Sequence, residues 1–142
     1  MAVKRVSPQD AKALMDQGYA YVDVRSIPEF EAGHPEGAYN VPLAHMGPAG
    51  FAPNHEFLHV MTARFPTDAK LVVGCKSGGR SAQAAALLET AGYTQVVDQR
   101  AGFDGAPAML GRGEPGWRPA GLPLETAAPQ ERTWEGLKKA AK

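Results

Sequence analysis

Residues 75–80 combine a nucleophile, two cations and two glycines in consecutive positions. They read Cys75, Lys76, Ser77, Gly78, Gly79 and Arg80. The apolar run 71–74 predicts a buried strand before this segment, and the alanine- and leucine-rich run 81–89 predicts a helix after it. A glycine-rich turn that leads into a helix directs several amide N–H groups to one point, where an anion is stabilised. That environment, with two cations beside it, favours the thiolate form of a cysteine.

Two interpretations of Cys75 compete. A single cysteine after a buried strand is more often a small apolar residue of the core than a reactive group. Here the residues that follow are polar, small or cationic, so they pack poorly in a core and bind anions well. We therefore interpret Cys75 as a reactive nucleophile and residues 76–80 as an anion-binding loop.

Strand-like and helix-like segments alternate along the rest of the chain. Ser7-Pro8 predicts a helix start, and so does Ser26 with Glu29 placed for a capping box. The expected strands span residues 3–6, 19–24, 38–41, 70–74 and 96–97. Two expected helices begin at residues 8 and 27, and three others span residues 55–65, 81–91 and 131–141. Residues 101–108 are expected to hold a turn and a short helix. This alternation predicts a doubly wound α/β fold, a mainly parallel sheet of about five strands with helices on both faces.

Polar residues at the end of the second strand are candidates for a supporting role. Asp23 and Arg25 follow an apolar run, and the carboxyl ends of parallel strands face the binding crevice of an open sheet. We interpret Asp23 as a structural acceptor for loop amides or for an arginine. Arg25 either assists anion binding or pairs with Glu29. His34 is a candidate base for Cys75, but we favour a histidine held by the backbone of a turn, because a cysteine already held as a thiolate needs no base.

Residues 44–55 read as a long loop because they hold two glycines and two prolines. A loop of this length often has a function. We expect it to border the site and to help select the substrate through His45 and Phe51. The alternative is an inert excursion on the surface.

Composition excludes several classes of protein. A chain of this length fits one domain, and its 15 Lys and Arg residues balance 15 Asp and Glu residues, which argues against nucleic acid or an acidic membrane as a partner. One cysteine excludes an internal disulfide, and the 4 histidines form no convincing metal set. The sequence shows no apolar stretch long enough for a membrane span and no apolar region of a signal peptide at its start. We expect a cytoplasmic protein without a metal or an organic cofactor.

Several segments together resemble the rhodanese (sulfurtransferase) family. The Cys-x-x-x-x-Arg loop between strand and helix resembles the active-site loop of that family. The other matching segments are residues 23–25, 29–30, 33–34, 37–42, 92–93, 102–103 and 120–123. The likeness covers residues 3–125 and is closest to single-domain members. It implies a rhodanese-like domain over residues 1–125, followed by an extension over 126–142 that is expected to form a short helix.

The resemblance implies sulfur transfer in two halves. Cys75 would take a sulfane sulfur from thiosulfate or a similar donor, become a persulfide, and pass that sulfur to cyanide or a thiol. The amides of residues 76–80 would hold the persulfide, and Lys76 and Arg80 would attract the anionic donor.

Three alternatives stay open at this point. The chain could be a persulfide carrier for a dedicated protein acceptor. It could be a cysteine phosphatase or arsenate reductase, although those loops usually place one more residue between cysteine and arginine. It could also be a regulatory module, but inactive family members often lack the cysteine that this chain keeps.

Overall fold

A five-stranded sheet forms the centre of the protein. The computed structural model describes residues 3–106 and 113–141. The strands of the sheet are β1 (Lys4–Val6), β2 (Ala20–Asp23), β4 (Tyr39–Asn40), β7 (Lys70–Gly74) and β8 (Gln95–Gln99). Their order is β1-β8-β7-β2-β4, and every neighbouring pair is parallel. The predicted parallel sheet is confirmed, and β7, the strand that leads to Cys75, lies at its centre.

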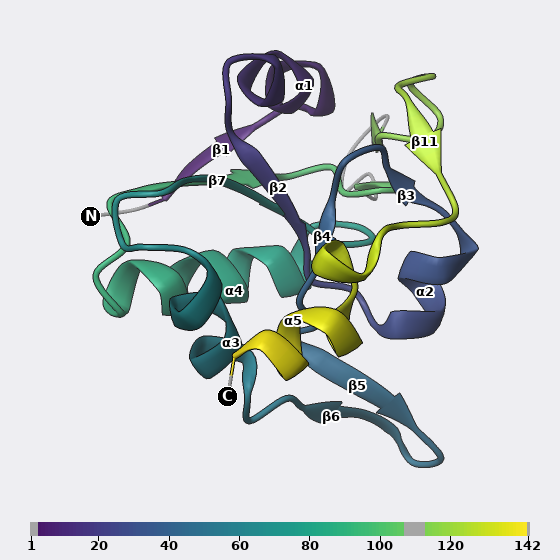
Figure 1. Ribbon diagram of the computed structural model, residues 1–142. Coiled ribbons are helices and arrows are strands. Elements are labelled where there is room, and N and C mark those ends of the chain that lie inside the picture. Colours follow the sequence, from purple (N-terminus) through teal and green to yellow (C-terminus); the bar gives the residue numbers. More distant parts are fainter. Residues whose placement is uncertain (1–2, 107–112, 142) are drawn as a thin grey trace.

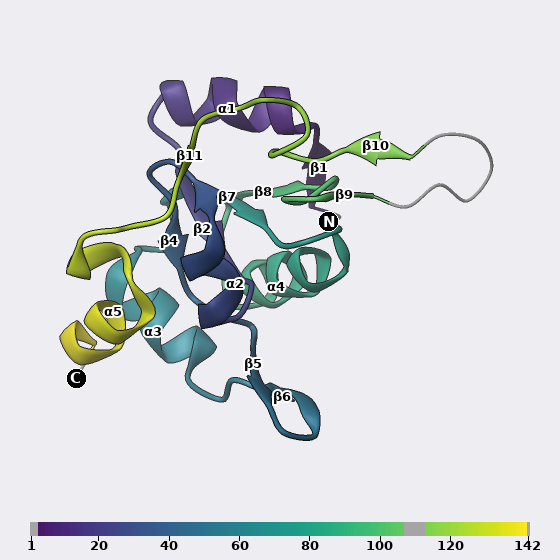
Figure 2. The same cartoon turned by 90° about the vertical axis from the view of Figure 1, so that its right-hand side faces the viewer.

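Helices cover both faces of this sheet (Figures 1 and 2). Their bounds are α1 (Pro8–Asp16), α2 (Ile27–Ala32), α3 (Phe57–Arg64), α4 (Gly79–Thr90) and α5 (Trp134–Ala140). The predicted caps are present, since the Ser7 hydroxyl accepts from the Asp10 amide at 3.1 Å and Glu29 accepts from the Ser26 amide at 3.1 Å. The α2 cap matters for the site described below, because it fixes the position of Glu29.

The sheet separates two hydrophobic cores. Because side chains alternate along a strand, Val22 and Val73 join the core on the side of α3, α4 and α5, whereas Tyr21 and Val72 join the core on the other side. The first core includes Met61, Leu88, Trp134 and Leu137, and the second includes Ala11, Phe30, Phe103 and Trp117. The last helix, α5, is therefore packed into the core through Trp134 and Leu137.

Residues 44–55 are not a loop. They contain a β-hairpin of β5 (Ala44–Gly47) and β6 (Gly50–Pro53), in which Met46 pairs with Phe51. The prediction was wrong because Pro48 lies in a two-residue turn at residues 48–49, between two paired strands. Gly47 and Gly50 flank this turn, and Gly50 has a φ of 104°. In Figure 2 the hairpin projects from the body of the domain.

Short elements complete the chain. β3 (His34–Pro35) pairs with β11 (Leu124–Glu125), β9 (Gly105–Ala106) pairs with β10 (Glu114–Pro115), and η1 (Gln130–Arg132) precedes α5. The helix expected within 101–108 is absent from residues 101–106, where Gly102 and Gly105 have φ values of 72° and 125° that no α-helix accepts; residues 107–108 lie outside the described residues. Within 3–106 and 113–141, no helix has the length and apolar character needed to cross a membrane.

Candidate functional site

Cys75 lies between the end of β7 and the start of α4, with 2% of its surface exposed. Its Sγ accepts a hydrogen bond from the Gly78 amide at 3.0 Å and lies 3.5 Å from the Ser81 hydroxyl, to which it donates. Ser81 in turn donates to the Gly78 carbonyl at 3.3 Å. An amide donor of the loop is thus directed at the sulfur atom, as an anion-binding loop at a helix start requires.

Of the two glycines in the loop, Gly78 is the one that the conformation requires. Its φ is 106°, and a Cβ there would meet the Arg100 carbonyl oxygen and lie 3.2 Å from an Arg5 guanidinium nitrogen. Gly79 has space for a side chain and begins α4. The sequence predicts a glycine-rich turn, and the backbone shows that the turn requires glycine at position 78 and not at position 79.

A neighbouring turn holds the loop from outside. The Phe103 and Asp104 amides donate to the Cys75 and Lys76 carbonyls at 2.7 and 2.9 Å. Gln99, at the end of β8, fixes this turn by accepting from the Gly102 amide at 2.8 Å and donating to its carbonyl at 2.8 Å. Sequence reasoning did not identify Gln99, because no pattern in the sequence shows which backbone groups its side chain reaches.

Arg80 forms a bidentate ion pair with Glu29, 2.7 and 3.0 Å across the two contacts. Burial alone would raise the pKa of Glu29, but the hydrogen bonds from Arg80 and Ser26 outweigh it and lower that pKa to about 2. The hydrogen bond to Glu29 likewise raises the pKa of Arg80. Glu29 therefore pairs with Arg80 and not with Arg25, and the charge of Arg80 is largely compensated.

Asp23 and Arg25 form a second, buried pair. The Arg25 guanidinium donates to Asp23 at 2.7 Å and to the Gly33 carbonyl at 2.7 Å, and it lies 4.3 Å from the centre of the Phe103 ring. Burial would lower the pKa of Arg25, but the Asp23 carboxylate outweighs it and the pKa is raised. Asp23 thus acts as an acceptor for an arginine, and Arg25 braces the Phe103 ring beside the loop.

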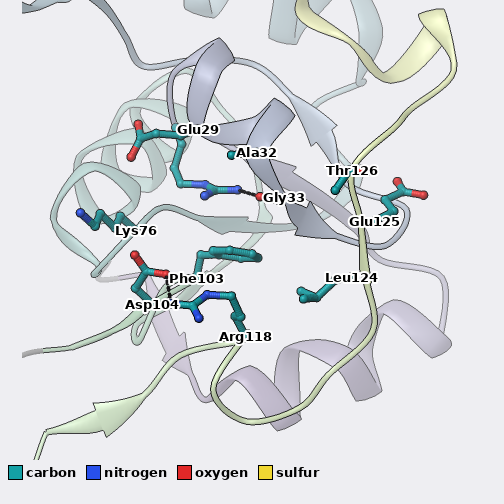
Figure 3. A pocket seen from close by; sticks show the side chains of 11 residues that line it. Glu29, Ala32, Gly33, Lys76, Phe103, Asp104, Arg118, Leu124, Glu125 and Thr126 are labelled. Carbon is teal, nitrogen blue, oxygen red and sulfur yellow. Dashed lines mark hydrogen bonds and ion pairs between the residues drawn. The ribbon is translucent and has the colours of Figure 1, made fainter.

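Lys76 is the exposed cation of the loop. No ion pair of Lys76 occurs in the part of the chain that the structure describes. It lines an open cleft of about 550 Å³ together with Phe103 and with the Arg118–Asp104 ion pair of 3.0 Å. Figure 3 shows Lys76 and Glu29 at one end of this cleft, Glu125 and Thr126 at the other, and the Phe103 ring between them. The cleft thus opens beside Lys76, on the outer side of the loop.

Within the described residues, the hydrogen bonds of Cys75 Sγ involve Gly78 and Ser81 and no histidine. His34 is fully buried, with Nδ1 2.7 Å from the Phe30 carbonyl and Nε2 3.1 Å from the Glu125 carboxylate. Its hydrogen bonds agree with the structural interpretation of that residue. His45 lies against the Trp134 ring, with ring centres 5.6 Å apart. Among residues 3–106 and 113–141, no group of three or more His, Cys, Asp or Glu side chains is placed to hold a metal ion.

Phe51 is the hairpin residue that reaches the loop. The Arg80 guanidinium carbon lies 4.8 Å from the centre of its ring, although 52% of Phe51 is exposed. Of the two candidates from the 44–55 segment, Phe51 borders the Cys75 loop and His45 packs against the C-terminal helix.

Comparison with known proteins gives a consistent assignment. The sequence pattern of the rhodanese-like domain matches residues 7–106. Thiosulfate sulfurtransferase 16, chloroplastic, of Arabidopsis thaliana is 41% identical over 98 residues, which cover 69% of this chain and 82% of that protein. Thiosulfate sulfurtransferase GlpE of Haemophilus influenzae is 32% identical over 128 residues, which cover 89% of this chain and 99% of that protein.

The fold comparison agrees. The crystal structure of Rv0390 from M. tuberculosis superposes with a TM-score of 0.74 at 27% identity, covering 89% of this chain and 100% of that one. Residues 7–106, which match the rhodanese-like domain, include the whole Cys75 loop, the Glu29–Arg80 pair and the Asp23–Arg25 pair. The chain belongs to the family of rhodanese-like domains.

Proposed function

We propose that this protein is a sulfurtransferase that moves a sulfane sulfur from thiosulfate, or a similar donor, to a thiophilic acceptor such as cyanide or a thiol. The observation that carries the proposal is the Gly78 amide directed at Cys75 Sγ, in a loop that opens α4. The thiosulfate sulfurtransferase names of the Arabidopsis and Haemophilus relatives support the choice of donor.

In the first half-reaction the Cys75 thiolate attacks the outer sulfur of thiosulfate. A bond forms between Sγ and that sulfur, the sulfur–sulfur bond of thiosulfate breaks, and its electron pair leaves with sulfite. The enzyme then carries Cys75–S–S⁻, whose negative charge lies on the terminal sulfur. Amide donors fixed before the reaction stabilise this charge without reorganisation.

In the second half-reaction the acceptor attacks the terminal sulfur. Cyanide forms thiocyanate, or a thiolate forms a new persulfide, while the bond to Sγ breaks and its electron pair returns to the Cys75 thiolate. A covalent intermediate between two half-reactions predicts ping-pong kinetics. Neither half requires a metal or an organic cofactor.

The cations beside Cys75 take different parts in this scheme. Lys76 is exposed at the cleft and attracts the dianionic donor, whereas Arg80 is neutralised by Glu29 and holds the first turn of α4 in place. Arg25 contributes through its contact with Phe103, which fixes the outer turn. A thiol that must stay reduced fits a reducing compartment, and we propose the cytoplasm.

Intact-protein mass spectrometry tests this proposal. After incubation with thiosulfate we expect the mass to increase by one sulfur atom, to return to its starting value with cyanide, and to stay constant in Cys75→Ala. If the wild type gains no sulfur from thiosulfate or from mercaptopyruvate, or if Cys75→Ala gains as much as the wild type, the proposal is wrong.

A further inference from the structure

An apolar groove of about 430 Å³ lies between the β5–β6 hairpin, the start of α3 and one face of α4. Three of its lining side chains are apolar yet well exposed: Phe51 at 52%, Leu58 at 36% and Leu87 at 42%. Among the described residues that line it, none is Asp, Glu, Lys or Arg, and three are polar: Asn54, His55 and Gln83. Large exposed apolar side chains are therefore clustered in this groove. Such a cluster indicates a binding surface, whereas single exposed apolar residues do not.

Phe51, a lining residue of this groove, also contacts Arg80 at the end of the Cys75 loop. Arg80, Gln83 and Leu87 are spaced by three and four residues along α4, so they share one helix face. Gln83 and Leu87 line the groove, and Arg80 lies at its end under the Phe51 ring, 4.8 Å away. Cys75 is buried at the start of the same helix. A ligand in the groove thus lies beside Phe51, next to the Arg80 end of the Cys75 loop.

The chemistry of the two regions selects the ligand. The described residues that line the groove include no ammonium or guanidinium group to match the charge of thiosulfate, a dianion, whereas Lys76 lines the other cleft. A thiolate with an apolar body fits this arrangement, with its sulfur directed at the Cys75 persulfide and its carbon chain against Phe51, Leu58 and Leu87. The volume lies within the range of small-molecule sites.

We propose that this groove is the acceptor subsite and that it binds a small thiol with an alkyl or aryl body. The inference rests on the proposed function, because it concerns the second half-reaction. The acceptor thiolate attacks the terminal sulfur of Cys75–S–S⁻, a bond forms between the two sulfurs, the bond to Sγ breaks, and the electron pair returns to Sγ. The products are an alkyl persulfide anion and the Cys75 thiolate.

Single-turnover unloading of the persulfide enzyme tests the inference. The enzyme is first loaded with thiosulfate, freed of excess donor, and mixed with ethanethiol, butanethiol or hexanethiol, and loss of the sulfur atom is followed by mass spectrometry. These thiols have nearly the same acidity, so their intrinsic reactivity is similar. A fully buried methylene is worth about fourfold in affinity. In an open groove we expect the second-order unloading constant to rise at least about tenfold from ethanethiol to hexanethiol.

Substitutions in the groove give the matched comparison. In Leu87→Gln and Leu58→Gln the ratio of the hexanethiol to the ethanethiol constant is expected to fall at least about threefold. Met46→Gln is the control, because Met46 is 53% exposed on the same hairpin and does not line the groove; its ratio should equal that of the wild type. All three residues are exposed, so the variants are expected to fold.

The outcomes separate the inference from the proposed function. If thiosulfate fails to load the wild type, the proposed function falls and the inference falls with it. If loading succeeds but the unloading constant does not depend on chain length, or if Leu87→Gln keeps the wild-type ratio, the inference alone is wrong. A wild-type dimer that Leu87→Gln dissociates would assign the groove to a second copy of the chain and would also overturn it.

Discussion

Removing the charge of Glu29 tests how strongly the Arg80 ion pair holds the loop helix. The Glu29 pKa of about 2, compared with an ordinary value of 4.5, corresponds to an upper limit of about 3 kcal/mol. Both side chains are 20% exposed, so solvent screening reduces this limit. We expect Glu29→Gln to lower the free energy of unfolding by about 1–2 kcal/mol at neutral pH.

The same pair predicts a pH dependence with a definite sign. A carboxyl group whose pKa is lower in the folded state stabilises the fold fully above its unfolded pKa, 4.5 for Glu, and loses this contribution as the pH falls toward the folded value. For Glu29 that value is about 2. The stability difference between the wild type and Glu29→Gln should therefore be constant above about pH 5 and shrink below it.

Urea unfolding, followed by the fluorescence of the buried Trp117 and Trp134, measures this difference. Glu31→Gln is the matched control, because Glu31 lies on the same helix, is exposed, and has no ion pair within the described ranges. Its stability should match that of the wild type at each pH. Equal stability of Glu29→Gln and Glu31→Gln at neutral pH, or a difference that persists undiminished in acid, would refute the reasoning.

Three further substitutions examine the loop and its supports. Gly78→Ala should destabilise the fold by about 2–3 kcal/mol in urea unfolding, because the backbone at Gly78 is left-handed and other atoms occupy the space that a Cβ would need. Gly79→Ala should be about as stable as the wild type, and equal losses of stability in the two variants would contradict this expectation. Lys76→Gln should raise the KM for thiosulfate about three- to tenfold in steady-state kinetics without lowering the melting temperature, and an unchanged KM would remove Lys76 from donor binding. Gln99→Leu should lower the free energy of unfolding in urea by about 2–3 kcal/mol and slow persulfide formation, because buried amides and a carbonyl of the turn at Gly102 lose their partner. A stable variant that loads sulfur at the wild-type rate would show that the turn does not need this side chain.

Local patterns predicted the parts of the site that depend on neighbouring residues. The apolar run before Cys75, the helix after it and the capping box at Ser26 are all readable within a few positions, and the structure has each of them. The parallel sheet was also predicted, because it follows from alternating strands and helices.

Contacts between residues far apart in the sequence could not be predicted from local patterns. Glu29 was predicted as a cap, and it has that role, but its pairing with Arg80 joins positions 51 residues apart and leaves no periodic signal. The hairpin at residues 44–53 was missed because glycine and proline indicate a turn without indicating that the flanking residues pair. Gln99 and Phe103 act on the loop through backbone groups, which no side-chain pattern records.

The turn at residues 101–104 determines the orientation of the peptide dipoles in the Cys75 loop. A peptide unit is planar and trans, so a carbonyl and the amide that follows it point in opposite directions. The Phe103 and Asp104 amides fix the Cys75 and Lys76 carbonyls on one side of the loop, and the Lys76 and Ser77 N–H vectors are thereby aimed at the other side. The orientation of these dipoles is thus set by residues that touch no substrate. Redesign of this protein for a different anion would have to begin at the 101–104 turn, since changing side chains within the loop leaves its peptide planes where that turn holds them.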